Sequence, residues 1–345
     1  MFLWKNTFKP HYRLKNQIVW LLHTQEFEFY MRHQQTLAKS SFLSGIGLHS
    51  GHPTSLAIHP APSNTGVIFV KHLAGHFQTC PATISCLGQT DHCTTLQAND
   101  FQIQTVEHIL GALAGLEIDN AYVELQGSEI PAGDGSAAPF VDILQQCGIS
   151  IQEEPRTYLK IVQPVSVEDK YRSITVLPSA LPHITYFIDF PHPLIQQQEY
   201  HHSCTALEFQ KNIAGARTFA FRQEVEFLWS RGLGLGGSLN NTIVFSDTGL
   251  VNEDGLRFPN ECIRHKVLDL IGDLSLLGLP IIGHVIAKCA GHALHTQLIQ
   301  TILNNPDKWI ILNAGEIGKE RVLNGHAFST STVRPPELQP AFHSL

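Results

Sequence analysis

The sequence predicts an α+β fold made of two domains that face each other. Its 345 residues exceed the length that a single hydrophobic core usually organises. A hydrophobic content of 43% with 15% charged residues is typical of a globular protein with a well-formed core. Predicted strands and helices follow each other in a similar order in the two halves, although the halves share no sequence repeat.

Residues 1–30 differ from the rest of the chain, because they are basic and aromatic and lack a regular hydrophobic period. Two interpretations are open: a real but poorly ordered extension, or translation that starts at Met31, the only methionine besides Met1. A strand-like pattern begins directly after Met31. We therefore place the N-terminal domain at 31–152.

In this domain the clearest element is a helix at 105–116, whose apolar residues recur at helical spacing. Thr105 is of a residue type that can cap its first turn. The other elements predicted here, in chain order, are strands at 55–59, 67–70 and 120–125, a turn at 131–135 and a helix at 137–146.

Residues 149–156, which contain Glu153-Glu-Pro155, predict a linker, and the C-terminal domain follows at 156–335. Its strongest element is a helix at 262–278, again with apolar residues at helical spacing. The remaining elements, in chain order, are strands at 158–166, 172–177 and 184–189, a helix at 205–214, a glycine-rich turn at 232–238, strands at 242–245 and 281–287, and a helix at 293–304.

Composition narrows the classes of partner and compartment. A net charge of −7 and a pI near 6.3 give no electrostatic reason to expect nucleic acid. The longest apolar run near the start, 18–22, is too short to span a membrane, so we expect no stable membrane insertion. The seven cysteines are scattered and include no C-x-x-C pair. This pattern favours a reducing compartment, and we expect a cytoplasmic protein.

Two short runs, about 150 residues apart, carry the residue types of a hydrolytic zinc site. The first is Glu107-His108, and the second places His265 and Asp269 four residues apart on one helix face. Together they offer two imidazoles, one carboxylate ligand and a spare glutamate that can act as a base. Taken alone, the second run fits a solvated ion pair better. Its apolar neighbours argue that a buried carboxylate there must be paired or metal-bound.

Other motifs are less specific. Asp134 lies in an Asp-Gly pair and is better explained as a turn residue than as a catalytic group. The glycine-rich run 232–238 lacks the lysine and the spacing of a phosphate loop. The chain has no H-E-x-x-H and no G-x-S-x-G, which argues against a zincin or a serine hydrolase. His292 follows a glycine at a strand-to-helix junction and is a candidate ligand or general acid.

Taken together, these runs and several others resemble the UDP-3-O-acyl-N-acetylglucosamine deacetylases, the zinc enzymes of lipid A biosynthesis. The matching segments, which occur in the family's order, are 44–51, 105–109, 115–120, 129–140, 216–219, 234–238, 264–273 and 291–294. The resemblance implies two similar two-layer α/β sandwich domains, each with a small insertion. In the C-terminal domain the insertion, at about 222–250, would wall a passage for the 3-O-acyl chain.

The resemblance also assigns a metal site. One zinc ion per chain would be bound by His108, His265 and Asp269, and Glu107 would be the general base that deprotonates the zinc-bound water. The water would attack the carbonyl carbon of the N-acetyl group on glucosamine. The products would be acetate and the free 2-amino sugar nucleotide.

Further roles follow from the same resemblance. The Thr218 hydroxyl would stabilise the oxyanion together with zinc. His292, protonated and oriented by Asp273, would protonate the amine leaving group. Lys266 would face the sugar or the diphosphate, and Asp189 and Phe190 would contact the uracil. The further expected substrate contacts are Phe219, Val225, Gly237 and Ser238.

One position departs from the family pattern. Three residues before the Gly-His histidine the family usually has a basic residue that contacts the diphosphate, but this chain has Cys289 there and Lys288 one position earlier. On a strand, a shift of one residue reverses the direction of the side chain, so Lys288 is not expected to replace it.

Two alternatives stay open. The first is a zinc amidase of the same fold that acts on another N-acylated amino sugar. The second is a degenerate, non-catalytic protein that binds a sugar nucleotide or lipid, although such a protein has no use for a spare base. In each case we expect a monomer.

Overall fold

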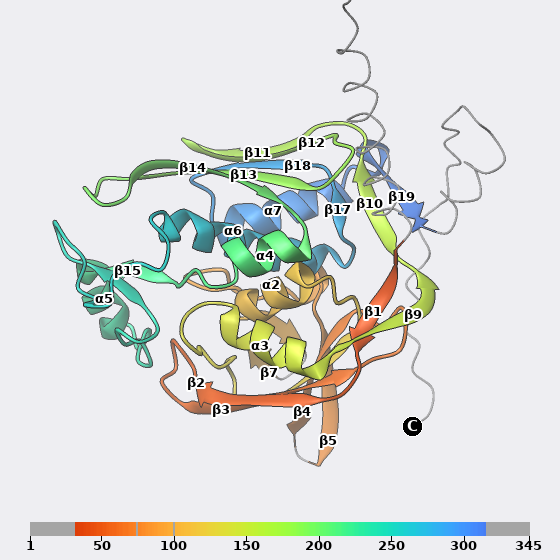
Figure 1. The fold of residues 1–345 in the computed structure, drawn as a ribbon, viewed down its shortest axis with the longest axis horizontal. Coiled ribbons are helices and arrows are strands. Elements are labelled where there is room, and N and C mark those ends of the chain that lie inside the picture. Colours follow the sequence, from red (N-terminus) through yellow and green to blue (C-terminus); the bar gives the residue numbers. More distant parts are fainter. Residues whose placement is uncertain (1–31, 74, 99–100, 315–345) are drawn as a thin grey trace, which may run out of the picture.

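The computed structural model describes residues 32–73, 75–98 and 101–314. The predicted extension at 1–30 and the last part of the predicted C-terminal domain, 315–335, lie outside the described residues. The described chain contains two five-stranded mixed sheets and the helices that cover them (Figure 1).

The N-terminal sheet has the strand order β2-β3-β8-β4-β5. Neighbouring strands are antiparallel except β8 and β4, which are parallel. Successive side chains of a strand point to opposite faces of the sheet, and in β3 and β8 alternate side chains are buried on one face. Along β3, for example, Leu56 and Ile58 are buried. The bounds are β2 (Ser41–Ile46), β3 (Pro53–Pro60), β4 (Val67–Leu73), β5 (His76–Pro81) and β8 (Ala121–Gln126).

The C-terminal sheet repeats this arrangement, with the order β11-β12-β18-β13-β14. Here too, neighbouring strands are antiparallel except the third and fourth strands of the sheet, β18 and β13, which are parallel. The expected pair of similar α+β units is therefore confirmed at the level of the sheets. The bounds are β11 (Val165–Asp169), β12 (Arg172–Leu177), β13 (His183–Phe190), β14 (Gln196–Ser203) and β18 (His284–Lys288).

Helices lie between the two sheets and pack against each other (Figure 1). The bounds are α2 (Glu107–Gly115) and α3 (Ala138–Cys147) beside the N-terminal sheet, and α4 (Ala206–Asn212), α6 (Glu261–Leu274) and α7 (His292–Leu303) beside the C-terminal sheet. One continuous cluster of buried apolar side chains runs through both sheets and these helices. The two halves of the chain thus meet across α2 and α6.

Smaller elements complete the fold. Residues 222–250 include α5 (Arg222–Ser230) and β16 (Ile243–Phe245), which pairs in parallel with β15 (Phe219–Phe221). The other elements are β1 (His33–Leu37), η1 (Ile84–Cys86), β6 (Leu96–Ala98), β7 (Phe101–Ile103), β9 (Ile149–Pro155), β10 (Thr157–Ile161), η2 (Ser275–Leu277), β17 (Ile281–Ile282), η3 (Pro306–Lys308) and β19 (Trp309–Asn313).

Several predicted elements differ from the structure. The predicted linker is wrong, because 149–155 forms β9, which pairs with β1 at the start of the described chain. The single strand expected at 158–166 is two strands, β10 and β11, which belong to different sheets. Thr105 does not cap α2: its backbone has a φ of 59°, and its hydroxyl donates to Glu129 Oε1 (2.9 Å). The division of the chain into two domains stays a prediction.

Gly272 permits the close crossing of α2 and α6. A Cβ atom at this position would overlap the carbonyl oxygen of Glu107, and no flexible side chain is there to move aside. We predict that Gly272→Ala lowers the free energy of unfolding by about 1–3 kcal/mol, as measured by chemical denaturation. Gly215→Ala is the control, because its Cβ would meet Phe258 at an ordinary 3.6 Å. Equal effects of the two substitutions would contradict this view of the crossing.

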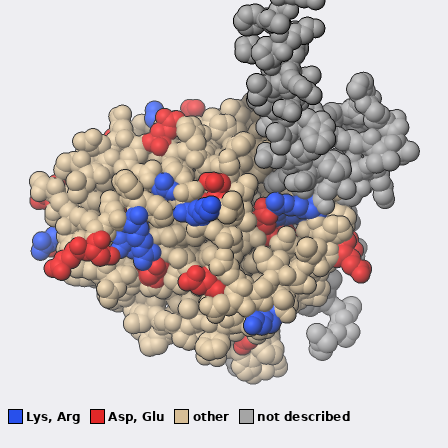
Figure 2. Space-filling model, in the orientation of Figure 1, with Lys and Arg blue, Asp and Glu red and all other residues tan. Residues whose placement is uncertain are grey.

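No helix within the described residues is both long and apolar enough to cross a membrane. On the face drawn in Figure 2, acidic and basic side chains lie singly or in small mixed groups among uncharged residues.

Candidate metal centre and active site

Three buried side chains from the two crossing helices form a group of potential metal ligands. His108 comes from the first turn of α2, and His265 and Asp269 lie one turn apart on α6. Their ligand atoms all lie within 4.8 Å of one another. Asp269 Oδ1 is 3.3 Å from His265 Nε2 and 3.7 Å from His108 Nε2. Two imidazoles and one carboxylate, with one position open, are a donor set suited to catalytic zinc.

The backbone fixes the orientation of one ligand. His265 Nδ1 lies 3.0 Å from the carbonyl oxygen of Ala216 and donates its proton there, which leaves Nε2 directed at Asp269. The next residue, Arg217, is fully buried. It forms an ion pair with Glu261 at the start of α6, in which Arg217 Nε lies 2.9 Å from Glu261 Oε1. This buried ion pair secures the segment that carries the Ala216 carbonyl.

Electrostatics also suit a cation at this place. Burial lowers the pKa of His265 to about 4, so its imidazole is the neutral form that binds metals. Burial alone would raise the pKa of Asp269, but the nearby His265 and the Lys266 ammonium outweigh it and hold this pKa well below its ordinary value. Lys266 Nζ donates to Asp269 Oδ2 (2.9 Å). The protonation states of His265 and Asp269 therefore suit a bound zinc ion.

Glu107 lies beside this group, as the sequence predicts, and is buried. The backbone amide of Thr94 donates to its Oε2 (3.0 Å). Burial raises the pKa of Glu107, against the opposing effect of His292 and then His108. A carboxylate with a raised pKa is a stronger base, which suits the acceptance of a proton from water.

His292 is the first residue of α7 and lies 2.7 Å, through Nδ1, from Asp273 Oδ2. Burial disfavours its charged form, but the carboxylate of Asp273, the hydrogen bond to it and the charges of Asp269 and Glu107 prevail and raise the pKa of His292 to about 9. The imidazole is therefore protonated at neutral pH and can donate a proton. Thr94 Oγ1 donates to the other oxygen of Asp273 (2.5 Å).

Aromatic side chains border the metal ligands on one side. The ring of Phe219 lies 6.5 Å from that of His265 and 5.5 Å from that of Phe190, measured between centroids. Lys266 Nζ is 5.9 Å from the Phe219 centroid. Asp189, beside Phe190, is exposed and accepts from Gln197 Nε2 (3.0 Å). A hollow of about 320 Å³ is lined by Asp189, Phe190, Pro191, His192, Pro193, Gln196 and Gln197.

The segment 218–250, which contains most of the predicted substrate contacts, is hydrogen-bonded to the N-terminal half of the chain. The amide of Thr218 donates to Gly135 O (2.8 Å), and Val225 lies half-buried on α5. Gly237 and Ser238 lie in the loop that follows α5. In that loop Gly236 approaches Gly47 so closely that a Cβ would overlap the Gly47 carbonyl.

Two other predictions can be compared with the geometry. Asp134 accepts from the amide (3.0 Å) and the hydroxyl (2.7 Å) of Ser136, which confirms its role as a turn residue. In the sheet, Lys288 of β18 lies beside Ser173 of β12 and Phe187 of β13, and its side chain is exposed. The preceding residue, Ala287, faces the buried side of the sheet. Lys288 therefore points away from the helix layer, and Cys289, with a φ of 48°, follows it.

Sequence reasoning missed residues that support the site. Thr94 contacts both the base and Asp273, yet no local pattern distinguishes it from other threonines. Glu129 accepts from the amides of His49 and Ser50, both at 2.8 Å. His295 also lies 2.7 Å from Asp273, and its spacing of three residues from His292 on one helix was a signal that could have found it.

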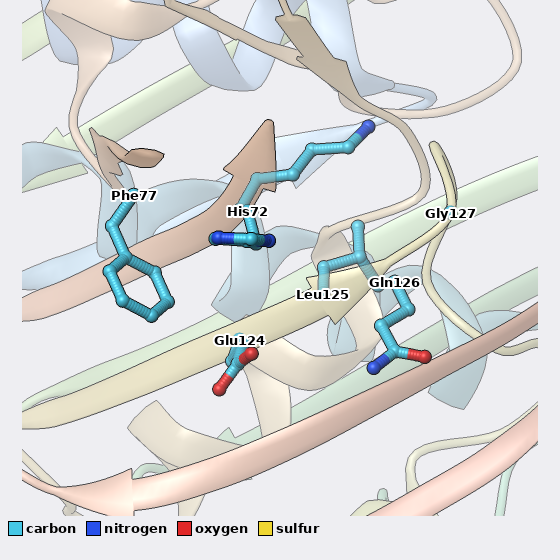
Figure 3. A pocket seen from close by; sticks show the side chains of 7 residues that line it. His72, Phe77, Glu124, Leu125, Gln126 and Gly127 are labelled. Atoms are coloured by element: carbon cyan, nitrogen blue, oxygen red, sulfur yellow. The ribbon is translucent and has the colours of Figure 1, made fainter. Parts of the chain in front are cut away.

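A hollow of about 450 Å³ lies elsewhere, at strands β4, β5 and β8 (Figure 3). It is lined by Lys71, His72, Phe77, Glu124, Leu125, Gln126 and Gly127. None of these residues belongs to the metal group. We therefore do not assign this hollow to the active site, although its volume is larger than that of the hollow beside Phe190.

A buried donor set of two histidines and one aspartate, with a separate carboxylate base and a protonated imidazole, defines the class of metal-dependent hydrolases. Comparison with known proteins narrows the class. The family model described as LpxC, UDP-3-O-acyl N-acetylglycosamine deacetylase, matches residues 34–304, and the chain belongs to this family. The resemblance found in the sequence is thereby confirmed.

Several curated relatives carry the name UDP-3-O-acyl-N-acetylglucosamine deacetylase. The protein of Myxococcus xanthus is 43% identical over 281 residues, which is 81% of this chain and 90% of the relative. That of Syntrophotalea carbinolica is 41% identical over 286 residues, 83% of this chain and 93% of the relative. That of Pseudomonas entomophila is 41% identical over 284 residues, 82% and 94% respectively.

Proposed function

We propose that this protein hydrolyses the N-acetyl group of UDP-3-O-acyl-N-acetylglucosamine, a step of lipid A biosynthesis. The products are acetate and the free 2-amino sugar nucleotide. The observation that carries the proposal is the meeting of a base and a proton donor at one buried donor set. Glu107, with a raised pKa, and His292, with a pKa of about 9, both lie beside His108, His265 and Asp269.

The donor set would hold one zinc ion per chain. Bound there, zinc would supply Lewis-acid activation of the attacking water and of the amide carbonyl. Glu107 would accept the proton of the attacking water, held in place by the hydrogen bond from Thr94 to Oε2. The Thr218 hydroxyl would donate to the oxygen that gains charge as the carbonyl carbon becomes tetrahedral.

His292 would complete the reaction. Its proton passes to the departing nitrogen, so that the sugar leaves as a neutral amine and acetate remains. Asp273 keeps this imidazole oriented through Nδ1, which directs Nε2 away from the carboxylate. Lys266, bonded to Asp269, would add positive charge towards the sugar or the diphosphate.

The substrate contacts follow from the same proposal. Phe190 and Asp189, at the hollow of about 320 Å³, would receive the uracil. Phe219, Val225, Gly237 and Ser238 would contact the sugar and the acyl chain along the insertion at 222–250. We further propose a monomer in a reducing, cytoplasmic compartment, which the seven free cysteines support.

The test is acetate release from UDP-3-O-acyl-N-acetylglucosamine by protein stripped of metal, before and after addition of one equivalent of zinc. We expect release only after zinc is added. No release from folded, zinc-loaded protein would overturn the proposal. Release from an N-acetylamino sugar that lacks the 3-O-acyl chain at an equal kcat/KM would favour the amidase of another substrate.

Asp189 offers a prediction specific to the nucleotide. Asp189→Ala should raise KM about tenfold or more and leave kcat within about twofold of that of the unchanged protein, because it removes binding that is equal in the ground and transition states. Steady-state kinetics of acetate release measures both constants. Glu199→Ala, on the neighbouring strand, is the control for loss of an exposed carboxylate. Equal loss in kcat would contradict the assignment.

A further inference from the structure

Asp273 is shared by two histidines of one helix. His292 and His295 lie three residues apart at the start of α7, and both Nδ1 atoms are 2.7 Å from the same oxygen, Oδ2. His295 and Asp273 are fully buried, with 0% of each side chain exposed. The second oxygen, Oδ1, accepts from the hydroxyl of Thr94 (2.5 Å). Each oxygen of this buried carboxylate thus has at least one hydrogen-bond donor.

The potential ligand atoms of Asp273, His292 and His295 also lie within 4.8 Å of one another, close enough to hold a metal ion. The contact lengths argue for direct hydrogen bonds. Donor atoms that share a zinc ion lie about 2.0–2.1 Å from it, which in tetrahedral geometry separates them by roughly 3.3 Å. The two contacts of 2.7 Å are of hydrogen-bond length. The group is therefore a hydrogen-bonded network.

The protonation of the two histidines differs. Burial lowers the pKa of His295, although Asp273 acts in the opposite direction, so this imidazole is neutral at pH 7. A neutral ring has one N–H, and its position at Nδ1 serves the bond to Asp273. Nε2 then lies 3.2 Å from the hydroxyl oxygen of Tyr186, and that hydroxyl donates its proton to Ala290 O (2.8 Å). His295 donates to Asp273 without adding charge.

A donor on Oδ2 changes what Asp273 does to His292. A carboxylate that accepts several hydrogen bonds disperses its charge and holds the proton of a neighbouring imidazole less tightly. The other charges near His292 are Glu107 from α2 and Asp269 from α6, and Lys266 lies near His295. Among the described residues, His292 and His295 are the hydrogen-bond donors to Asp273 Oδ2.

We propose that His295 is a positioning residue for the proton donor His292. Its Nδ1–H fixes Asp273 and takes part of the charge of Oδ2, so that Asp273 orients His292 and still lets it release its proton. This inference rests on the proposed deacetylase function and adds to it a residue that touches neither the substrate nor the metal ligands.

The test compares two substitutions of His295. His295→Leu removes the donor, whereas His295→Asn places an amide N–H near the position of Nδ1 and keeps it. We expect His295→Leu to lower kcat about tenfold or more, to leave KM unchanged and to move the alkaline limb of the kcat–pH profile upwards by about half a unit or more. His295→Asn should retain kcat within about threefold and the limb within about 0.2 units of the unchanged protein.

His202→Leu is the matched control. His202 is another buried histidine of the C-terminal half, but it lies on β14 at the edge of the sheet, whereas Asp273 lies on α6. Its removal should leave kcat and the alkaline limb unchanged. Zinc content and thermal unfolding are measured for every variant. If His295→Leu does not fold, His295→Gln replaces it, because its amide N–H lies nearer the position of Nε2 and loses the bond to Asp273.

The outcomes separate the two proposals. If the unchanged protein releases acetate and the folded variant without the donor shows the same kcat and the same alkaline limb, the role of His295 is overturned. If the unchanged protein releases none, the proposed function fails. In that case ¹⁵N NMR of the metal-free protein still tests the role of His295. The pKa of His292 should be higher in His295→Leu than in the unchanged protein, and an equal pKa in both overturns the inference.

Discussion

Replacing Glu107 by Gln should lower kcat by about 10²- to 10⁴-fold, the range that a general base contributes. The change keeps the size of the side chain and removes its capacity to accept a proton. Glu107 is no member of the metal group, so the zinc content of Glu107→Gln should stay at one equivalent. Acetate release and metal analysis of the same preparation measure the two effects.

The control for this substitution is Glu124→Gln, a change of the same type on β8, outside the metal group. It should leave kcat and zinc content unchanged. Full activity of Glu107→Gln would show that Glu107 is not the general base and would overturn its assigned role. Loss of zinc together with activity would make Glu107 a ligand and not a base.

Replacing His292 by Gln should lower kcat by about 10²- to 10³-fold, because the leaving nitrogen would depart without a proton donor. The pH profile gives the sharper test. His292 must be protonated to act, and with a pKa of about 9 it is protonated below that pH and loses its proton above it. The activity of the unchanged protein should therefore fall as pH rises through about 9, and His292→Gln should lose this alkaline limb.

The acidic limb has the opposite origin. Glu107 must be ionised to accept a proton, and burial raises its pKa above the ordinary value. Activity should rise as pH increases through that raised pKa, and this limb should persist in His292→Gln. An alkaline limb that also persists in His292→Gln would show that another group, such as Lys266, causes it.

Local sequence patterns predicted much of the fold. The apolar periodicity of the sequence predicted α2 and α6, the two helices that carry the metal group, because the residues of one buried helix face recur at helical spacing. The spacing of His265 and Asp269 placed them on one face, and the structure brings His108 to them. These features depend on residues within one or two helical turns of each other.

The features that the sequence did not predict depend on contacts distant along the chain. Residues 149–155 look like a linker because they are charged and contain proline, but β1, more than 110 residues earlier, supplies the partner that makes them a strand. Thr94 reaches Asp273 from 179 positions away. In the sequence, Arg217 is one residue of a short motif, and only the structure shows that it forms an ion pair with Glu261. No local period encodes such pairings.

The matching strand order of the two sheets has a consequence for how the metal centre is assembled. In each half, four strands of the five-stranded sheet precede a helix, and the fifth strand of the sheet and a further helix follow it: α2, β8 and α3 correspond to α6, β18 and α7. The equivalent helices α2 and α6 pack against each other. Since α2 carries His108 and α6 carries His265 and Asp269, neither half holds the complete ligand set, and the metal centre exists only where the two halves of the chain meet.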